Sequence, residues 1–230
     1  MTESGAPLLH AADLHVRFGR TAALVGASVD VRPGEILALL GPSGSGKSTL
    51  LHCLAGILVP GAGEVHYRGS RLDVLPDAVR SRLRRDDFGF VFQFGQLVPE
   101  LTALENVALP LRLGGVRRRP AEDQARSWLG RLEVDDVADH RPGEISGGQG
   151  QRVAVARALV TGPRVVFADE PTGALDSLNG ENVMTLLTEA ARDQGATVLL
   201  VTHAPRVAAY ADREIVLRDG RVAAYDGALA

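Results

Sequence analysis

Residues 36–48 read ILALLGPSGSGKS, an apolar run followed by a glycine-rich turn that ends in a lysine and a serine. The continuous apolar run Ile36–Leu40 is typical of a central strand in a parallel sheet. The turn fits the pattern G-x-x-x-x-G-K-[ST], in which glycines let the backbone curl until its N–H groups point at phosphate oxygens. A helix is predicted over residues 47–55, and its positive N-terminal end would face the same anion.

The members of this turn have separate predicted roles. Lys47 is placed to reach the β- and γ-phosphates of a nucleotide, and the hydroxyl of Ser48 is placed to ligate Mg²⁺. The predicted phosphate site comprises Gly41, Pro42, Ser43, Gly44, Ser45, Gly46, Lys47, Ser48 and Thr49. The alternative is a glycine-rich turn that matches by chance, which the strand before it and the helix after it disfavour.

A second apolar run ends in two acidic residues, VVFADE at residues 165–170. Open parallel sheets bind ligands at the carboxyl ends of their strands, which is where these two carboxylates are expected. Asp169 is predicted to orient Mg²⁺ through water, and Glu170 to polarise an attacking water as a general base. Two acidic residues after a strand are also typical of a solvated strand end. The motif indicates a metal-bound phosphate site only because the glycine-rich turn occurs in the same chain.

A third segment, ISGGQ at residues 145–149, precedes an amphipathic helix predicted at residues 151–160. Ser146 fits an N-cap, and the two glycines expose backbone N–H groups to another phosphate. Because the chain already has one phosphate-binding loop, a second one is expected to bind the nucleotide of a neighbouring subunit. Taken alone, the segment is also compatible with a flexible loop before a helix.

These motifs resemble the nucleotide-binding domains of ABC transporters, along nearly the full chain. The segment around Ser146, Gly147, Gly148 and Gln149 is similar to the ABC signature motif. The resemblance implies four further site residues. Gln93 in FVFQ would be the Q-loop glutamine that reaches the metal and the attacking water, and Asp176 in ALD would be part of the D-loop. His203 in LLVTH would be the switch histidine at the γ-phosphate, and Phe18 in VRFG the aromatic ring that stacks on adenine.

The implied catalytic set is Lys47, Gln93, Glu170 and His203, and the implied metal ligands are Ser48, Gln93 and Asp169. The cofactors that the resemblance implies are ATP and Mg²⁺. Three positions depart from the family pattern. Ala204-Pro205 follows His203 where an acidic residue is common, Gly150 replaces a residue that usually carries a side chain, and position 18 is Phe rather than the commoner Tyr.

Alternating strand and helix patterns on both sides of a helical stretch predict an α/β fold. The expected form is a P-loop NTPase core with a mostly parallel sheet, an N-terminal antiparallel β subdomain and a helical insertion that carries the signature. One domain over residues 1–230 is expected, with the helical subdomain at about 95–160. Further strands are predicted at residues 8–16, 27–31, 65–67, 88–92, 197–201, 215–218 and 221–224, and a further helix at 181–192. Asp219-Gly220 predicts a hairpin between the last two strands.

Composition excludes several classes of partner. The 230 residues carry a net charge of −3, which gives no general attraction to nucleic acid, and no nucleic-acid partner is expected. Two arginine-rich pieces, 80–85 and 117–119, could be nucleic-acid patches, but nearby acidic residues favour solvated faces. The apolar runs are far shorter than the ~20 residues that a spanning helix needs. Cys53, the one cysteine, is expected to be a small buried residue rather than a nucleophile.

Within the family, the sequence is most similar to the branch of macrolide-efflux, lipoprotein-release and cell-division ATPases, through FVFQ, LTALENV (101–107) and ADEPTGALD (168–176). That resemblance implies a separate transmembrane permease, a second ABC ATPase subunit with a homodimer expected, and a peripheral location at the cytoplasmic face of the cell membrane. The implied work is export or mechanotransmission. Two alternatives stay open: an ATPase that regulates a membrane partner without transport, and a soluble non-transport ABC ATPase.

Overall fold

The computed structural model describes residues 6–223, which form two compact units. One unit contains the described residues up to Arg82 together with those from Thr197 onward, and the other is Leu83–Ala196. One domain with a helical subdomain inserted at residues 95–160 stays a prediction. In the described part of the chain, no helix combines the length and the apolar character needed to cross a membrane.

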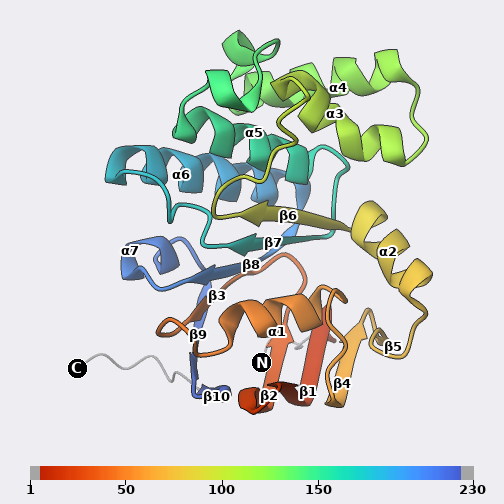
Figure 1. The fold of residues 1–230 in the computed structure, drawn as a ribbon, viewed down its shortest axis with the longest axis vertical. Helices are drawn as coiled ribbons and strands as arrows, with labels where there is room; N and C mark the ends of the chain where they lie inside the picture. The colour runs from red at the N-terminus through yellow and green to blue at the C-terminus, as the bar shows by residue number, and fades with distance from the viewer. Residues whose placement is uncertain (1–5, 224–230) are drawn as a thin grey trace. The chain divides into compact units, whose positions relative to one another are not determined.

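The first unit contains an antiparallel sheet in the order β2-β1-β4-β5. Its strands are β1 (Leu9–Phe18), β2 (Thr21–Val31), β4 (Ala62–Tyr67) and β5 (Ser70–Arg71). Along β1, buried and partly exposed side chains alternate for much of its length, as expected of a strand with one solvated face. Helix α1 (Lys47–Leu54) packs against β1, β2 and β4, as Figure 1 shows. This is the predicted N-terminal antiparallel subdomain.

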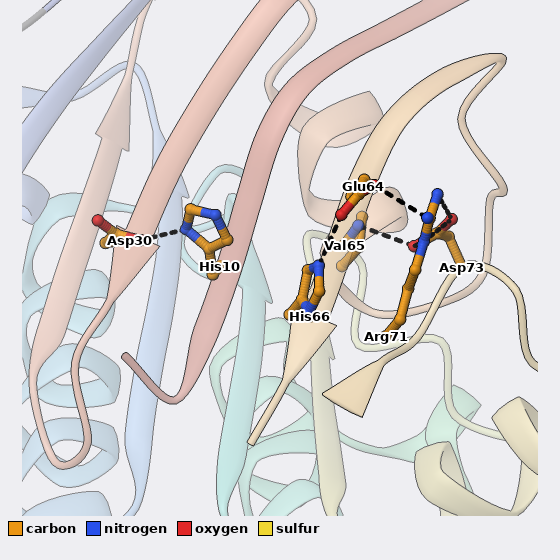
Figure 2. Close-up of polar contacts among 7 residues, drawn as sticks. All are labelled: His10, Asp30, Glu64, Val65, His66, Arg71 and Asp73. Carbon is orange, nitrogen blue, oxygen red and sulfur yellow. Dashed lines mark hydrogen bonds and ion pairs between the residues drawn. The ribbon is translucent and has the colours of Figure 1, made fainter. Parts of the chain in front are cut away.

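The polar side chains of this sheet pair with one another (Figure 2). His10 Nδ1 lies 2.5 Å from Asp30 Oδ1, and His66 Nε2 lies 3.0 Å from Glu64 Oε2. Arg71 Nη1 donates to Glu64 Oε1 at 2.9 Å. Solvent screens such partly exposed pairs, so they add little to stability, and the buried apolar residues stabilise the sheet.

The first unit also contains the strand that precedes the glycine-rich turn. Strand β3 (Ile36–Leu40) runs parallel to β8 (Thr197–Thr202) on one side and to β9 (Arg213–Arg218) on the other. Strand β10 (Arg221–Ala223) pairs antiparallel with β9. The intervening Asp219 and Gly220 have φ of 48° and 73°, which confirms the predicted hairpin turn. The end of the last predicted strand, at residue 224, lies outside the described residues.

The second unit holds a parallel strand pair and most of the helices. Strands β6 (Phe88–Phe92) and β7 (Val165–Asp169) pair in parallel. The other elements are α3 (Ala103–Leu113), α4 (Arg118–Arg131), the short 3₁₀ turns η1 (Asp135–Val137) and η2 (Pro142–Glu144), α5 (Gly147–Leu159) and α6 (Ser177–Gln194). Helix α5 packs against β6, α3, α4 and α6, which makes it the central helix of this unit (Figure 1).

Several helical features differ from the sequence predictions, including α6, which runs over Ser177–Gln194 rather than 181–192. Helix α2 (Asp77–Asp86) was not predicted, because it buries no residue and therefore lacks an apolar periodicity. Its arginines include Arg85, paired with Asp86 at 2.7 Å. Helix α5 begins four residues before the predicted start, since its N-cap lies inside the signature segment. The short helix α7 (Pro205–Ala208) follows β8 and was also not predicted.

Cys53 lies on α1 with 1% of its surface exposed, as predicted for a buried structural cysteine. Burial raises the pKa of its thiol to about 12. Since the thiolate is the reactive form, we expect iodoacetamide at about pH 8 to leave Cys53 unmodified in the native protein. The same reagent should alkylate it fully in denaturant, as intact-mass spectrometry would show. Equal alkylation rates in the two conditions would contradict the buried placement.

Candidate functional site

The glycine-rich turn of the first unit follows β3 and can be built only with glycine at two positions. A Cβ atom at Gly41 would lie 2.2 Å from the carbonyl oxygen of Leu217, and one at Gly46 would lie 2.3 Å from that of Ala23. Both residues have positive φ, 152° and 103°. The backbone of the turn is therefore fixed by its packing against neighbouring strands, which a side chain would prevent.

The polar groups of this turn fit a bound polyphosphate. Lys47 is 8% exposed, and its Nζ donates to the carbonyl oxygens of Gly41 at 2.8 Å and Pro42 at 2.9 Å. The hydroxyl of Ser45 is buried and has no hydrogen-bond partner among the described residues. The first turn of α1 has no acidic residue, and Gly46 supplies no side-chain cap. An ammonium, an orphan hydroxyl and uncapped N–H groups thus gather in one loop, which suits an anion.

Strand register places His203 at the same sheet edge as this turn. Leu40, the last residue of β3, is the pairing partner of Thr202, the last residue of β8. Gly41 and His203 are therefore the next residues of two neighbouring parallel strands. His203 is exposed. This is the arrangement expected when a histidine side chain is to reach a group held by the turn.

Phe18 ends β1 in the same unit, and 56% of its surface is exposed. Its ring lines a cavity of about 620 Å³ together with Leu58 and Val59. An exposed aromatic face beside aliphatic side chains can stack on a flat ring.

In the second unit, Gln93 and Glu170 follow neighbouring parallel strands. Phe92 of β6 pairs with Asp169 of β7, so the two strands end together. A Cβ atom at Gly173 would lie only 2.8 Å from Gln93 Nε2, and the N–H of Gly173 donates to the carbonyl oxygen of Glu170 at 3.0 Å. The amide of Gln93 therefore lies against the turn that begins at Glu170. The Q-loop glutamine and the backbone of the predicted general base thus belong to the same local arrangement.

Glu170 has φ of 49°, a left-handed conformation that is uncommon outside glycine. Such strained residues cost about 1–3 kcal/mol and concentrate at functional sites. Glu170 is partly exposed.

The signature segment forms the start of α5. Ser146 is the N-cap: its Oγ accepts from the N–H of Gln149 at 3.2 Å, and Gln149 Oε1 accepts from the N–H of Ser146 at 2.9 Å. This reciprocal capping box engages the Gln149 side chain within the helix end. Ser146 and Gly147 are exposed, whereas Gly148 is buried. The exposed part of the turn is therefore Ser146 and Gly147, at the capped N-terminal end of α5.

The signature segment and the D-loop contact each other. A Cβ atom at Gly148 would lie 2.9 Å from Asn179 Oδ1. Asp176 is the N-cap of α6, where its Oδ1 accepts from the N–H of Asn179 at 2.9 Å and its Oδ2 from the side-chain amide of Asn179 at 2.6 Å. These two hydrogen bonds hold the pKa of Asp176 below its ordinary value. Asn179 thereby connects two motifs, a role that the sequence analysis missed.

Two residues that contact the Gln93 segment were not singled out from the sequence, Gln151 and Arg157 of α5. Both donate to the backbone of the Gln93 loop. The available signal was Arg157 itself, a lone charge in the otherwise apolar run Val153–Val160. An arginine in such a run needs hydrogen-bond acceptors within the fold.

Among the described residues, no group of three or more His, Cys, Asp or Glu side chains is arranged to hold a metal ion. Mg²⁺ bound with a nucleotide ordinarily needs only one or two carboxylates, with phosphates and water as its other ligands. Each unit supplies one donor of this kind: the exposed hydroxyl of Ser48 in the first unit and the carboxylate of Asp169 at the end of β7 in the second.

Comparison with known proteins identifies the family of the chain. The family model described as ABC transporter matches residues 10–173. The ATP-binding cassette MJ0796, in a dimeric post-hydrolysis state bound to ADP and Pi, is 39% identical with a TM-score of 0.86, and the match covers 94% of this chain and 97% of that chain. A second dimeric structure of MJ0796, described as a bacterial ABC transporter cassette, is 39% identical with a TM-score of 0.87 over the same shares.

A third solved structure is CbiO1 from Clostridium perfringens, described as part of the ABC transporter complex CbiONQ. It is 30% identical with a TM-score of 0.85, and the match covers 95% of this chain and 88% of that chain. The matched family model spans more than half of the chain, and the likeness to the solved cassettes extends over nearly all of it. The chain therefore belongs to the ABC transporter family, as an ATP-hydrolysing nucleotide-binding domain of that family.

Proposed function

We propose that this chain is the ATP-binding subunit of an ABC membrane complex, in which two copies pair head to tail and drive a separate permease. The observation that carries the proposal is the signature turn. Ser146 and Gly147 are exposed at the start of α5 and offer a hydroxyl and helix N–H groups to an anion outside the chain. The dimeric cassettes of MJ0796 support the pairing. Each nucleotide would lie between one copy's phosphate loop and the other copy's signature turn.

Within this arrangement, each copy supplies most of one site. Residues 41–49 bind the phosphates, with Lys47 neutralising charge on the β- and γ-phosphates. The Phe18 ring stacks on adenine, as its exposed face allows. The second copy adds Ser146, Gly147 and Gly148 of its signature turn. Because Gln149 is engaged in the capping box, its contribution is to hold the turn.

Hydrolysis needs a base, an oriented water and stabilisation of the developing charge. Glu170 accepts the proton of the water that attacks the γ-phosphorus, and the Gln93 amide orients that water. His203 donates a hydrogen bond to the γ-phosphate. Ser48, Gln93 and Asp169 would hold Mg²⁺, which supplies positive charge to the phosphate oxygens. The products are ADP and phosphate.

The mechanical output follows from differential binding. ATP binds the closed pair better than the open pair, because its phosphates accept charge-assisted hydrogen bonds from both copies. Cleavage divides that charge between two products and lets the pair open. Asp176 in the D-loop lies at the surface beside the signature turn, where it would sense the partner's position.

The permease would bind the region of residues 94–104. Phe94 follows Gln93 and has 76% of its surface exposed, which suits a protein contact. CbiO1, which is described as part of a transporter complex, supports a membrane partner. The subunit would then lie at the cytoplasmic face of the membrane. The sequence resemblance to the macrolide-efflux, lipoprotein-release and cell-division branch favours export or mechanotransmission as the process that ATP hydrolysis drives.

Co-purification tests this proposal. Tagged Glu170→Gln would be expressed in the native cells, given ATP and Mg²⁺, solubilised gently and analysed by mass spectrometry. The matched control is the same variant purified without nucleotide. We expect a permease with few spanning helices and a large extracytoplasmic part, enriched when ATP is present.

Other partners would change the conclusion in different ways. A permease with many spanning helices would keep the transporter role and contradict the branch. A soluble complex without a membrane protein would contradict the transport proposal and leave the ATPase activity untouched.

A further inference from the structure

The loop that follows Gln93 is held by two hydrogen bonds from one arginine of α5. Arg157 Nη2 donates to the carbonyl oxygen of Gly95 at 2.7 Å, and Nη1 donates to that of Gln96 at 2.8 Å. Both acceptor residues have left-handed backbone, with φ of 66° and 46°. Gln96 is not glycine, so this conformation needs support from outside the loop. A planar guanidinium fixes the direction of both carbonyls at once.

A glutamine of the same helix holds the loop on the other side of Gln93. Gln151 is 3% exposed, and its Nε2 donates to the carbonyl oxygen of Phe92 at 2.9 Å. A Cβ atom at Gly95 would lie 3.5 Å from Gln151 Oε1, so this side chain runs close along the loop. The residues before and after Gln93 are therefore both tied to α5.

Burying the charged guanidinium of Arg157 costs desolvation free energy that an uncharged side chain would avoid. Arg157 lies in the apolar run Val153–Val160, and burial lowers the pKa of its guanidinium below the ordinary value. A buried charge is tolerated where hydrogen bonds replace the lost water. Here those hydrogen bonds go to the backbone of the loop that carries Gln93.

We propose that Arg157, assisted by Gln151, is a positioning residue for Gln93. The two side chains hold the loop so that the Gln93 amide stays against Gly173, beside the turn of Glu170. Helix α5 begins in the signature turn, so the same hydrogen bonds make Gln93 and that turn move together. The proposal deepens the proposed function and rests on the role of Gln93 at the attacking water.

Steady-state kinetics with a double-mutant cycle test the proposal. Arg157→Ala should lower kcat roughly 10–100-fold, the range for a reacting group displaced by about 1 Å. ATP affinity should stay unchanged, because residues 41–49 are untouched. In the Gln93→Ala background, Arg157→Ala should cause no further loss of kcat, since both changes remove the same positioned amide. Arg157→Lys keeps the charge and one donor group, and it should recover part of kcat.

The matched control is Arg152→Ala on the same helix. Arg152 Nη1 also donates to backbone carbonyls, those of Leu132 at 3.3 Å and Glu133 at 2.9 Å, outside the Gln93 loop. It should show a comparable loss of thermal stability with kcat retained per folded molecule. Should Arg157→Ala not fold, Arg157→Lys is compared with Arg152→Lys in the same assays.

Two results would overturn the proposal. One is a kcat for Arg157→Ala no lower than that of Arg152→Ala. The other is multiplicative losses in the double variant, which would mean that Arg157 acts elsewhere than through Gln93. Full turnover in Gln93→Ala alone is a distinct failure: it removes Gln93 from the proposed function, and the positioning proposal falls with it.

Discussion

Glu170→Gln is expected to bind ATP with unchanged affinity and to hydrolyse it roughly 10²–10⁴-fold more slowly, the usual contribution of a general base. The substitution keeps the size of the side chain and its hydrogen-bonding reach. It removes the carboxylate that accepts the proton from the attacking water. Phosphate release at saturating ATP measures the loss, and titration with a fluorescent ATP analogue measures the affinity.

The matched control for this variant is Glu189→Gln, an exposed carboxylate on α6. It removes the same charge from the same unit away from the strand end, and it should hydrolyse ATP at the wild-type rate. Turnover of Glu170→Gln equal to that of the control would remove Glu170 from the role of base. A loss of ATP affinity in step with the loss of turnover would indicate a binding role instead.

Lys47→Ala is expected to weaken ATP binding roughly 10–100-fold. Hydrogen bonds to charged groups contribute about 1.5–3 kcal/mol, and every 1.4 kcal/mol changes an equilibrium constant tenfold. The ammonium also donates to the carbonyls of Gly41 and Pro42, so its loss should loosen the turn. Isothermal titration with ATP measures the affinity, and thermal unfolding without nucleotide measures the effect on the fold.

Arg32→Ala serves as the control for Lys47→Ala, since it removes one exposed positive charge from the same unit outside the turn. It should bind ATP like the wild type. If Lys47→Ala bound ATP equally well, the assignment of residues 41–49 as the phosphate site would be wrong. The assignment would also be wrong if Lys47→Ala bound ATP with wild-type affinity once its affinity is corrected for the fraction of protein that is folded.

The elements with strong local signals were predictable from the sequence. The buried strands β3 and β6 match their predicted bounds, because continuous apolar runs ended by polar residues leave little freedom. The turn at Asp219-Gly220 was likewise predictable, since both residues favour positive φ. Helix α2 was not, because it buries nothing and therefore leaves no periodic trace in the sequence.

The candidate site was predictable as a set of motifs and less so as a set of contacts. The register of Phe92 with Asp169 follows from strand pairing, which no local pattern encodes. The capping role of Gln149 could have been read from its position three residues after Ser146, where a capping box places it. The contact of Gly148 with Asn179 joins residues 31 positions apart and depends on how α5 packs on α6.

The position of Lys47 has a consequence for protein chemistry. Lys47 is the only lysine in the sequence, and the other residues of the Lys and Arg class are all arginines. A guanidinium stays protonated and does not attack acylating reagents near neutral pH. Apart from the α-amino group, an amine-directed acylating reagent therefore has a single target in this protein, an ammonium 8% exposed and hydrogen-bonded to the carbonyls of its own loop. The extent of acylation of Lys47 should therefore report the fraction of phosphate loops that have bound nucleotide.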